Sequence, residues 1–368
     1  MKQLIKKITS KFGYQTHKKQ ILILSDDWGS VRLKSLAARQ AIRNKGIDVD
    51  ANRFDQFDCL ESNKDVEDLF EVLTKYKDHL GNHPCITAVT NVANPNFEAI
   101  KNSGFKQYHF EKNINTYKRY PNSNRVFSLV KDGIAAKIFM PQSHAREHLQ
   151  VNWWMAELQK ENSMARKVFK EEFFFLRNNH LVNKELSGLG GSLQAKYSED
   201  FTSAAKITNS ALETFKEIYG YKSDYFCPPA QFYPESILPI LSSRDIKWLD
   251  VARTQKVARL HKKPKQSFRI LGQKSSYGFR YLVRNAVFES NLSNDSDGVD
   301  SCLKNIQDAF DCKQPAIISN HRVSFVGGIE EQNRIKGLKA LDTLLTQILK
   351  KWPEVEFINL QDLAKEEK

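Results

Sequence analysis

The sequence predicts an α/β fold, a distorted (β/α) barrel of about seven to eight parallel strands with helices outside. Short apolar runs alternate along the chain with longer stretches whose apolar residues recur at i, i+3 and i+4. Such alternation is typical of a parallel sheet covered by helices, and about eight strand candidates in one run favour a barrel over an open sheet. No proline-rich linker divides the chain. We therefore expect one barrel domain over residues 20–368, preceded by a basic segment at 1–19.

The strands are predicted where apolar and β-branched residues run together between polar or turn-forming residues. In chain order these runs are 20–25, 85–92, 135–140, 223–227, 246–251, 284–289, 316–319 and 355–360. The clearest amphipathic helices are predicted at 65–80, 203–219, 299–310 and 330–352. Gly220 and Pro353 follow two of these helices and mark their ends. Residues 145–222 are mainly helical in pattern, and we expect them to form an insertion on one barrel loop.

Composition limits the classes of function. The chain has 368 residues, of which 40% are hydrophobic, and a formal net charge of +13. This charge suits an anionic partner, but no nucleic-acid-binding motif is present, so we expect no nucleic-acid partner. The five cysteines are scattered without a C-x-x-C spacing, which favours a reducing, cytoplasmic location. No run reaches the roughly 20 apolar residues of a membrane span, while peripheral membrane contact through the basic N-terminus stays open.

Polar residues follow several of the predicted strands. Asp26 and Asp27 follow the first strand, and His144 and His148 follow the third. Asp250, Glu289 and His321 stand at the ends of three later strands. In a parallel β/α barrel the carboxyl ends of the strands share one face, and that face carries the active site. We therefore expect these side chains to meet in one pocket.

The stretch 144-HAREH-148 places two histidines four residues apart, a spacing that brings both onto one face of a helix or helical turn. Two such imidazoles and a carboxylate from a neighbouring strand end would form an Asp/His/His set with one open position, the pattern of catalytic zinc. A solvated surface pair is the alternative. The same letters also match H-x-x-E-H, the inverted zinc-peptidase pattern, in which Glu147 would be the base.

With 24-LSDDWG-29, 144-HAREH-148 and 318-ISNH-321 in this order, the sequence resembles the polysaccharide deacetylase superfamily of NodB-type fold, over about residues 20–360. The resemblance implies that Asp26 is the general base and His321 the general acid. It also implies that Asp27, His144 and His148 hold one divalent metal ion, zinc being the expected one. The family's arginine-proline-proline motif is represented by 226-FCPPAQF-232, which lacks the arginine that braces the base. Arg32 and Arg322 are the candidates to replace it.

The implied reaction is hydrolysis of an N-acetyl or O-acetyl group on a carbohydrate, with the metal activating water and polarising the acetyl carbonyl. Further residues are expected to bind the substrate: Trp28 by stacking on a sugar ring, and Asn91, Asn94, Arg146, Asp250, Glu289 and Arg322 by polar contacts. A cytoplasmic location points to a lipid-linked or nucleotide-linked precursor of a surface polysaccharide. The missing arginine keeps a second alternative open, a non-catalytic glycan-binding barrel.

Overall fold

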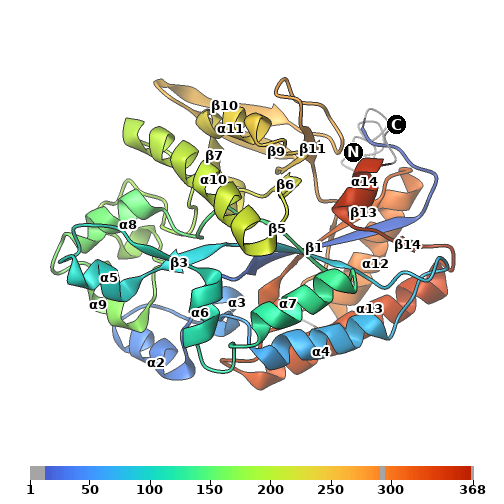
Figure 1. The fold of residues 1–368 in the computed structure, drawn as a ribbon, viewed down its shortest axis with the longest axis horizontal. Helices are drawn as coiled ribbons and strands as arrows, with labels where there is room; N and C mark the ends of the chain where they lie inside the picture. Colours follow the sequence, from blue (N-terminus) through green and yellow to red (C-terminus); the bar gives the residue numbers. More distant parts are fainter. Residues whose placement is uncertain (1–12, 291–294, 366–368) are drawn as a thin grey trace.

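A computed structural model describes residues 13–290 and 295–365 (Figure 1). Among these residues, nine strands form the main sheet, and every pairing within it is parallel. Eight of them follow one another in the order β11 (Arg280–Leu282), β8 (Trp248–Asp250), β6 (Tyr225–Phe226), β5 (Phe139–Ser143), β2 (Ile86–Thr90), β1 (Gln20–Trp28), β13 (Ala316–His321) and β12 (Ala286–Val287). The ninth, β14 (Glu356–Phe357), pairs with the start of β1.

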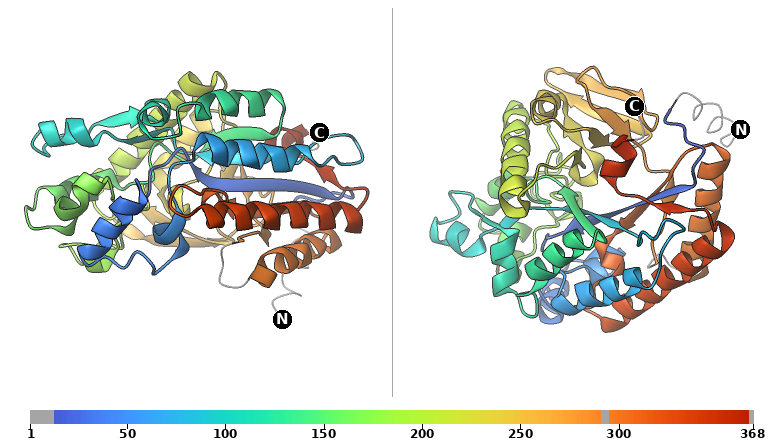
Figure 2. Two further views of the ribbon diagram at one scale, coloured as in Figure 1. Left: turned by 90° about the horizontal axis from the view of Figure 1, so that it is seen from below. Right: turned by 45° about the vertical axis from the view of Figure 1, so that its right-hand side comes forward.

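This sheet confirms the predicted fold class. It curls into part of a barrel with helices around it (Figures 1 and 2). In the described chain no pairing joins β11 to β12, so the barrel is distorted and open there. The carboxyl ends of the parallel strands lie on one face, as the sequence predicts.

Both faces of β1 are buried, as parallel sheets require. Leu22 and Leu24 belong to one apolar cluster, whereas Ile21 and Ile23 belong to another. The second cluster lies under the outer helices, and Figure 2 shows α4 and α13 side by side along β1. The helices outside the insertion are α2 (Leu36–Asn44), α3 (Arg53–Phe57), α4 (Asn63–Thr74), α5 (Phe97–Asn102), α6 (Asn113–Arg119), α7 (Val126–Ala135), α11 (Leu238–Ser243), α12 (Asp295–Asp311), α13 (Glu331–Lys351) and α14 (Leu360–Lys365).

Local chemistry sets the helix ends. Ser62 and Asp65 form a reciprocal capping box at the start of α4, so two backbone N–H groups that lack helical partners are satisfied. Gly220 ends α10 (Ser198–Tyr219) with a φ of 79°, a left-handed conformation that glycine adopts without strain. This confirms the end predicted at Gly220. Pro353 directly follows the Trp352 C-cap of α13.

The strand β1 carries one extra residue close to its carboxyl end. Its register against β2 pairs Ser25 with Ala88 and Trp28 with Thr90, so three steps on β1 match two on β2. The extra residue is a β-bulge, and Asp27 within it has a φ of 75°. A bulge interrupts the alternation of side chains between the two faces of a strand. Asp26 and Asp27 therefore reach the same pocket, although neighbours on a regular strand point apart.

Residues 144–224 connect the adjacent strands β5 and β6. They contain α8 (Val151–Leu158), α9 (Met164–Val168) and the long helix α10, together with a mostly irregular stretch between α9 and α10. A separate three-stranded sheet is formed by β7 (Tyr233–Pro234), β9 (Thr254–Arg259) and β10 (Lys262–Phe268), at the top of Figure 1. A two-stranded sheet pairs β3 (Ala93–Pro95) with β4 (Phe110–Lys112).

Several predicted strands are shorter in the structure, as at 223–227 and 355–360, where β6 and β14 have two residues each, and two others differ further. The apolar run 135–140 is divided, because α7 continues to Ala135 and β5 begins only at Phe139. Lys137, with a φ of 57°, makes the turn between them. The predicted strand 284–289 contains only the two residues of β12, while β11 lies just before it and was not predicted.

Most of the predicted basic segment 1–19, with its proposed membrane contact, lies outside the described residues. Across 13–290 and 295–365, no helix combines the length and apolar character needed to cross a membrane.

Candidate active site

A cavity of about 360 Å³ opens where the strands β1, β5, β6 and β13 end. It is lined by all five residues predicted to carry the chemistry: Asp26, Asp27, His144, His148 and His321. Pro228, Ala230 and Gln231 form part of its wall after β6, and Arg32 and Phe54 also line it. The convergence expected of parallel strand ends is therefore present in the structure.

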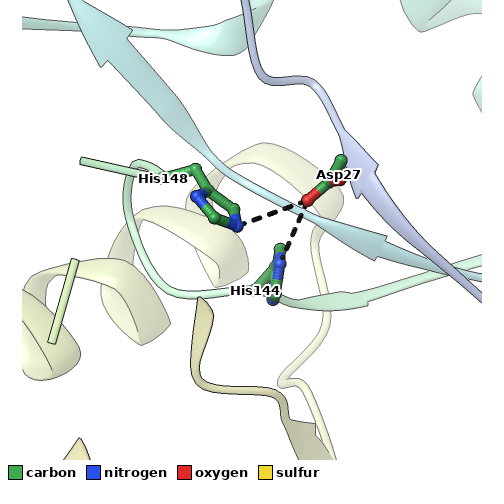
Figure 3. A group of neighbouring side chains, drawn as sticks. All are labelled: Asp27, His144 and His148. Carbon is green, nitrogen blue, oxygen red and sulfur yellow. Dashed lines mark ion pairs between the residues drawn. The ribbon is translucent and has the colours of Figure 1, made fainter. Parts of the chain in front are cut away.

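Asp27, His144 and His148 converge on one point (Figure 3). The Asp27 Oδ1 atom lies 3.4 Å from His144 Nε2 and 3.5 Å from His148 Nε2. Two ligands about 2.1 Å from a tetrahedral metal ion lie about 3.4 Å apart. The histidines lie on an irregular loop after β5 and not on a helix, and Ala145, with a φ of 61°, turns the chain between them.

The orientation and charge of these side chains also fit a metal ion. His144 Nδ1 lies 2.9 Å from the Cys227 carbonyl oxygen, to which only an N–H can donate, and this contact directs Nε2 towards Asp27. Burial lowers the pKa of His148 to about 4, despite the opposing charge of Asp27. Burial alone would raise the pKa of Asp27, but the interactions with His144 and His148 hold it well below its usual value. At neutral pH the set is one carboxylate and a neutral His148, the states that bind zinc.

Asp26 is held by Arg284 rather than by Arg32 or Arg322. The Arg284 guanidinium lies 2.8 Å from each oxygen of the Asp26 carboxylate. Its Nε donates to Asp250 Oδ2 at 2.8 Å, and its remaining N–H groups reach Ser319 Oγ and the Tyr225 hydroxyl, both at 3.1 Å. Each of the three guanidinium nitrogens therefore donates to at least one acceptor. The bidentate contact fixes the orientation of Asp26, which a single charge could not do.

His321 lies beside Asp26, because the register of β13 against β1 pairs the two residues. Its Nε2 lies 3.9 Å from Asp26 Oδ2, and its Nδ1 lies 2.5 Å from Glu289 Oε1. Burial would lower the pKa of His321, but the charge of Glu289 and its hydrogen bond outweigh burial and raise it. Arg53 contacts the other Glu289 oxygen at 2.5 Å. Glu289 therefore favours the protonated imidazolium, the form that can act as an acid.

Asp250 and Glu289 do not line the cavity, so they are not placed to contact the substrate as predicted. They instead position the side chains of Arg284 and His321. Both are buried, with 0% and 4% of their surface exposed. Asp250 holds Arg284, and it also accepts hydrogen bonds from Tyr225 and Gln231. Glu289 holds His321.

The predicted stacking of Trp28 on a sugar is wrong. Trp28 is only 2% exposed and packs edge-on against Phe139 with 4.8 Å between ring centroids. Its Nε1 donates to Ser25 Oγ. The bulge at Asp27 explains the error, because it turns Trp28 to the face of Ile21 and Ile23 while both aspartates face the cavity.

Four other residues predicted to bind substrate are structural. Asn91 and Asn94 are fully buried and hold backbone: Asn91 donates to the His144 carbonyl, and Asn94 donates to that of Gly29. Arg322 is also fully buried and pairs with Asp58 and Glu61. Arg146 is paired with its neighbour Glu147 and does not line the cavity.

Glu147 has 0% of its surface exposed and accepts both hydrogen bonds from Arg146. It does not line the cavity, so it is not placed to act as the base of a zinc peptidase. The structure thus contradicts the role that the H-x-x-E-H pattern requires of it.

Arg284 is the main site residue that the sequence did not indicate. Its position was assigned to the beginning of a strand at 284–289, the end away from the catalytic face. In the structure it follows the carboxyl end of β11, with Val283 between them, and so reaches the same face as Asp26. A signal existed in the chain, since Arg284 lies between two apolar runs where a buried cation requires an anionic partner.

No protein-family model matches this chain, and no curated protein sequence does. Solved structures similar to it include a protein from Parabacteroides distasonis assigned as a glycoside hydrolase or deacetylase (TM-score 0.49, 8% identity, covering 95% of this chain and 72% of that one). A second, from Mycobacterium smegmatis, is assigned as a polysaccharide deacetylase (TM-score 0.44, 9% identity, covering 96% of this chain and 92% of that one). A third is a GH57 branching enzyme from Thermococcus kodakaraensis (TM-score 0.46, 9% identity, covering 96% of this chain and 72% of that one).

Polysaccharide deacetylases, the family that the motifs resemble, are therefore among the solved structures to which this chain is similar.

Proposed function

We propose that this protein is a metal-dependent hydrolase that removes an N-acetyl or O-acetyl group from a carbohydrate. The observation that carries the proposal is the separation of three roles in one cavity. Asp27, His144 and His148 provide a metal-donor set, Asp26 is held by Arg284, and His321 is held by Glu289. Metal-assisted hydrolysis of an amide or ester needs these three functions.

Asp27, His144 and His148 would hold one divalent ion, with zinc suited to this ligand set. When bound, the ion supplies Lewis-acid activation of the acetyl carbonyl and acidification of water. Asp26 takes the proton from the attacking water, and Arg284 keeps the carboxylate aimed at that position. His321 gives its proton to the nitrogen or oxygen of the sugar as the bond to the acetyl carbon breaks. The products are acetate and the free amine or hydroxyl.

Two observations weigh against the alternatives. The peptidase alternative needs Glu147 in the cavity, where it does not lie. The non-catalytic alternative rested on the missing motif arginine, and Arg284, between β11 and β12, contacts Asp26 as a bracing arginine would. We therefore propose a catalytically complete site on a carbohydrate substrate.

The test is acetate release by purified protein, stripped of metal and reloaded with Zn²⁺, Co²⁺ or Mn²⁺. The substrate panel comprises N-acetylglucosamine oligomers, O-acetylated xylo-oligosaccharides, a nucleotide-linked N-acetyl sugar and a lipid-linked one. We expect acetate from at least one member, only in the reloaded protein. Peptide hydrolysis without acetate release, with metal bound, would contradict the proposal.

Replacing Glu289 by glutamine should change the pH profile of the reaction. Glu289 raises the pKa of His321, and its loss leaves Arg53 as a cation near the imidazole. The pKa of His321 should then fall, so the protonated acid is lost at lower pH. We expect the alkaline limb of the kcat/KM profile to move to lower pH, while the rate at acidic pH is better retained. An unchanged alkaline limb would show that His321 is not the general acid. The matched control is Glu354→Gln, which replaces a glutamate on the surface.

A further inference from the structure

The sheet formed by β7, β9 and β10 adjoins the cavity. Gln231 lines the cavity, and β7 begins two residues later at Tyr233. Gln255 of β9 donates to the Gln231 carbonyl at 2.8 Å, which ties the sheet to the cavity wall. The sheet is therefore joined to the cavity wall, and Phe232 directly follows a residue that lines the cavity.

This outer face presents two phenyl rings on either side of a lysine. Tyr233 and Val257 pair in the register and are buried, at 2% and 6% exposed. By alternation, their neighbours Phe232 and Lys256 share the opposite, outer face. Phe268 pairs with Thr254 on that same face, and the Phe232 and Phe268 side chains are 50% and 45% exposed. Two strand spacings and two residue rises put the rings about 12 Å apart.

The surrounding segment is strongly cationic. Residues 251–288 contain ten lysine and arginine residues and no aspartate or glutamate. Lys256, Lys262, Lys263 and Lys265 are exposed, and none of them forms an ion pair with a carboxylate of the described residues. Unpaired cations of one sign attract and concentrate an anionic ligand.

Protection of an open sheet edge explains only part of this pattern. Lysines and Pro264 on β10 are what an exposed edge strand uses to prevent pairing with another chain. Lys256 lies on β9, however, which is the central strand of the three. Edge protection also gives no reason to expose Phe232 and Phe268, since apolar rings favour association.

We infer that the outer face of β7, β9 and β10 binds a negatively charged glycan chain that extends from the acetylated sugar in the cavity. The phenyl rings contact the apolar faces of sugar rings, and Lys256 and the hairpin lysines pair with the acidic groups. The inference rests on the proposed function in one respect, namely that the bound glycan is also the substrate of the cavity. Two exposed rings on a sheet that is joined to the cavity wall favour a glycan continuous with the substrate over a lipid surface.

The test measures binding, independently of acetate release. The probe is a hyaluronan oligomer, in which glucuronate alternates with N-acetylglucosamine, and the uncharged comparison is a chitin oligomer of equal length. We expect wild-type protein to bind hyaluronan about tenfold more tightly at low salt and to lose this preference at high salt. Lys256→Gln should abolish the preference, and Phe232→Ala with Phe268→Ala should weaken binding of both oligomers. Lys336→Gln with Lys339→Gln on α13, at the opposite side in Figure 1, should change neither.

Equal affinity for the two oligomers, or affinities that the sheet variants leave unchanged, would overturn the inference. So would equally tight binding of single-stranded DNA or phosphatidylglycerol vesicles through the same lysines. Thermal unfolding midpoints equal to wild type show that the variants are folded. Acetate release by the metal-loaded wild type from any member of the carbohydrate panel described above tests the proposed function separately. Hyaluronan binding through this sheet without such release would contradict the proposed function and leave the binding face supported.

Discussion

Asp26→Asn is expected to reduce acetate release by roughly a hundredfold to ten-thousandfold while the metal content stays at the wild-type level. Asparagine keeps the shape of the side chain but cannot accept a proton from water. Arg284 retains its contact with Asp250, so the buried guanidinium keeps one anionic partner. The measurements are kcat/KM for acetate release, and metal content by elemental analysis of the purified variant.

Two further variants sharpen the assignment of Asp26. Arg284→Lys retains the positive charge but loses the bidentate contact, so we expect an intermediate loss of kcat, on the order of tenfold to a hundredfold. Glu147→Gln should stay close to wild type in kcat, because Glu147 lies outside the cavity. If Asp26→Asn retained activity while Glu147→Gln lost it, Asp26 would not be the base. Loss of metal from Asp26→Asn would place Asp26 among the ligands instead.

The five chemical residues of the cavity were predictable because a simple rule governs them. Polar side chains directly after buried strands meet at one face of a parallel barrel, whatever their separation in the sequence. Asp26, Asp27, His144, His148 and His321 all follow or end such strands, and all line the cavity. The family motifs then gave each residue an expected role, which the Asp27–His144–His148 geometry fits.

The errors arose where this rule needs information that the sequence does not carry. Trp28 was assigned to the cavity because neither the bulge nor its effect on alternation can be read from the residues 24–29. Arg284 was missed because β11 has only three residues, too few for a period-two pattern. Asn91, Asn94 and Arg322 were assigned to substrate, although a polar residue near strand ends also serves to satisfy buried backbone or charge.

His148→Ala is expected to weaken metal binding by at least about a hundredfold, more than the loss of a residue that only orients a ligand. His144 Nε2 and His148 Nε2 lie 3.4 Å and 3.5 Å from Asp27 Oδ1, the spacing of ligands around one metal ion. Removing one imidazole therefore leaves only two donors. Acetate release should fall with the metal content and recover in part when excess Zn²⁺ is added. The matched control is His109→Ala, which removes a histidine outside the cavity.

Metal content and acetate release, measured together in each variant, distinguish the role of the three ligands from that of Asp26. In His148→Ala, metal and acetate release should be lost together, whereas in Asp26→Asn activity alone should be lost. Metal lost from His148→Ala with activity intact would show that the ion is not catalytic. Metal retained in His148→Ala would show that the ion binds elsewhere. Either result would separate the Asp27–His144–His148 set from the reaction, because a catalytic ion must depend on its protein ligands.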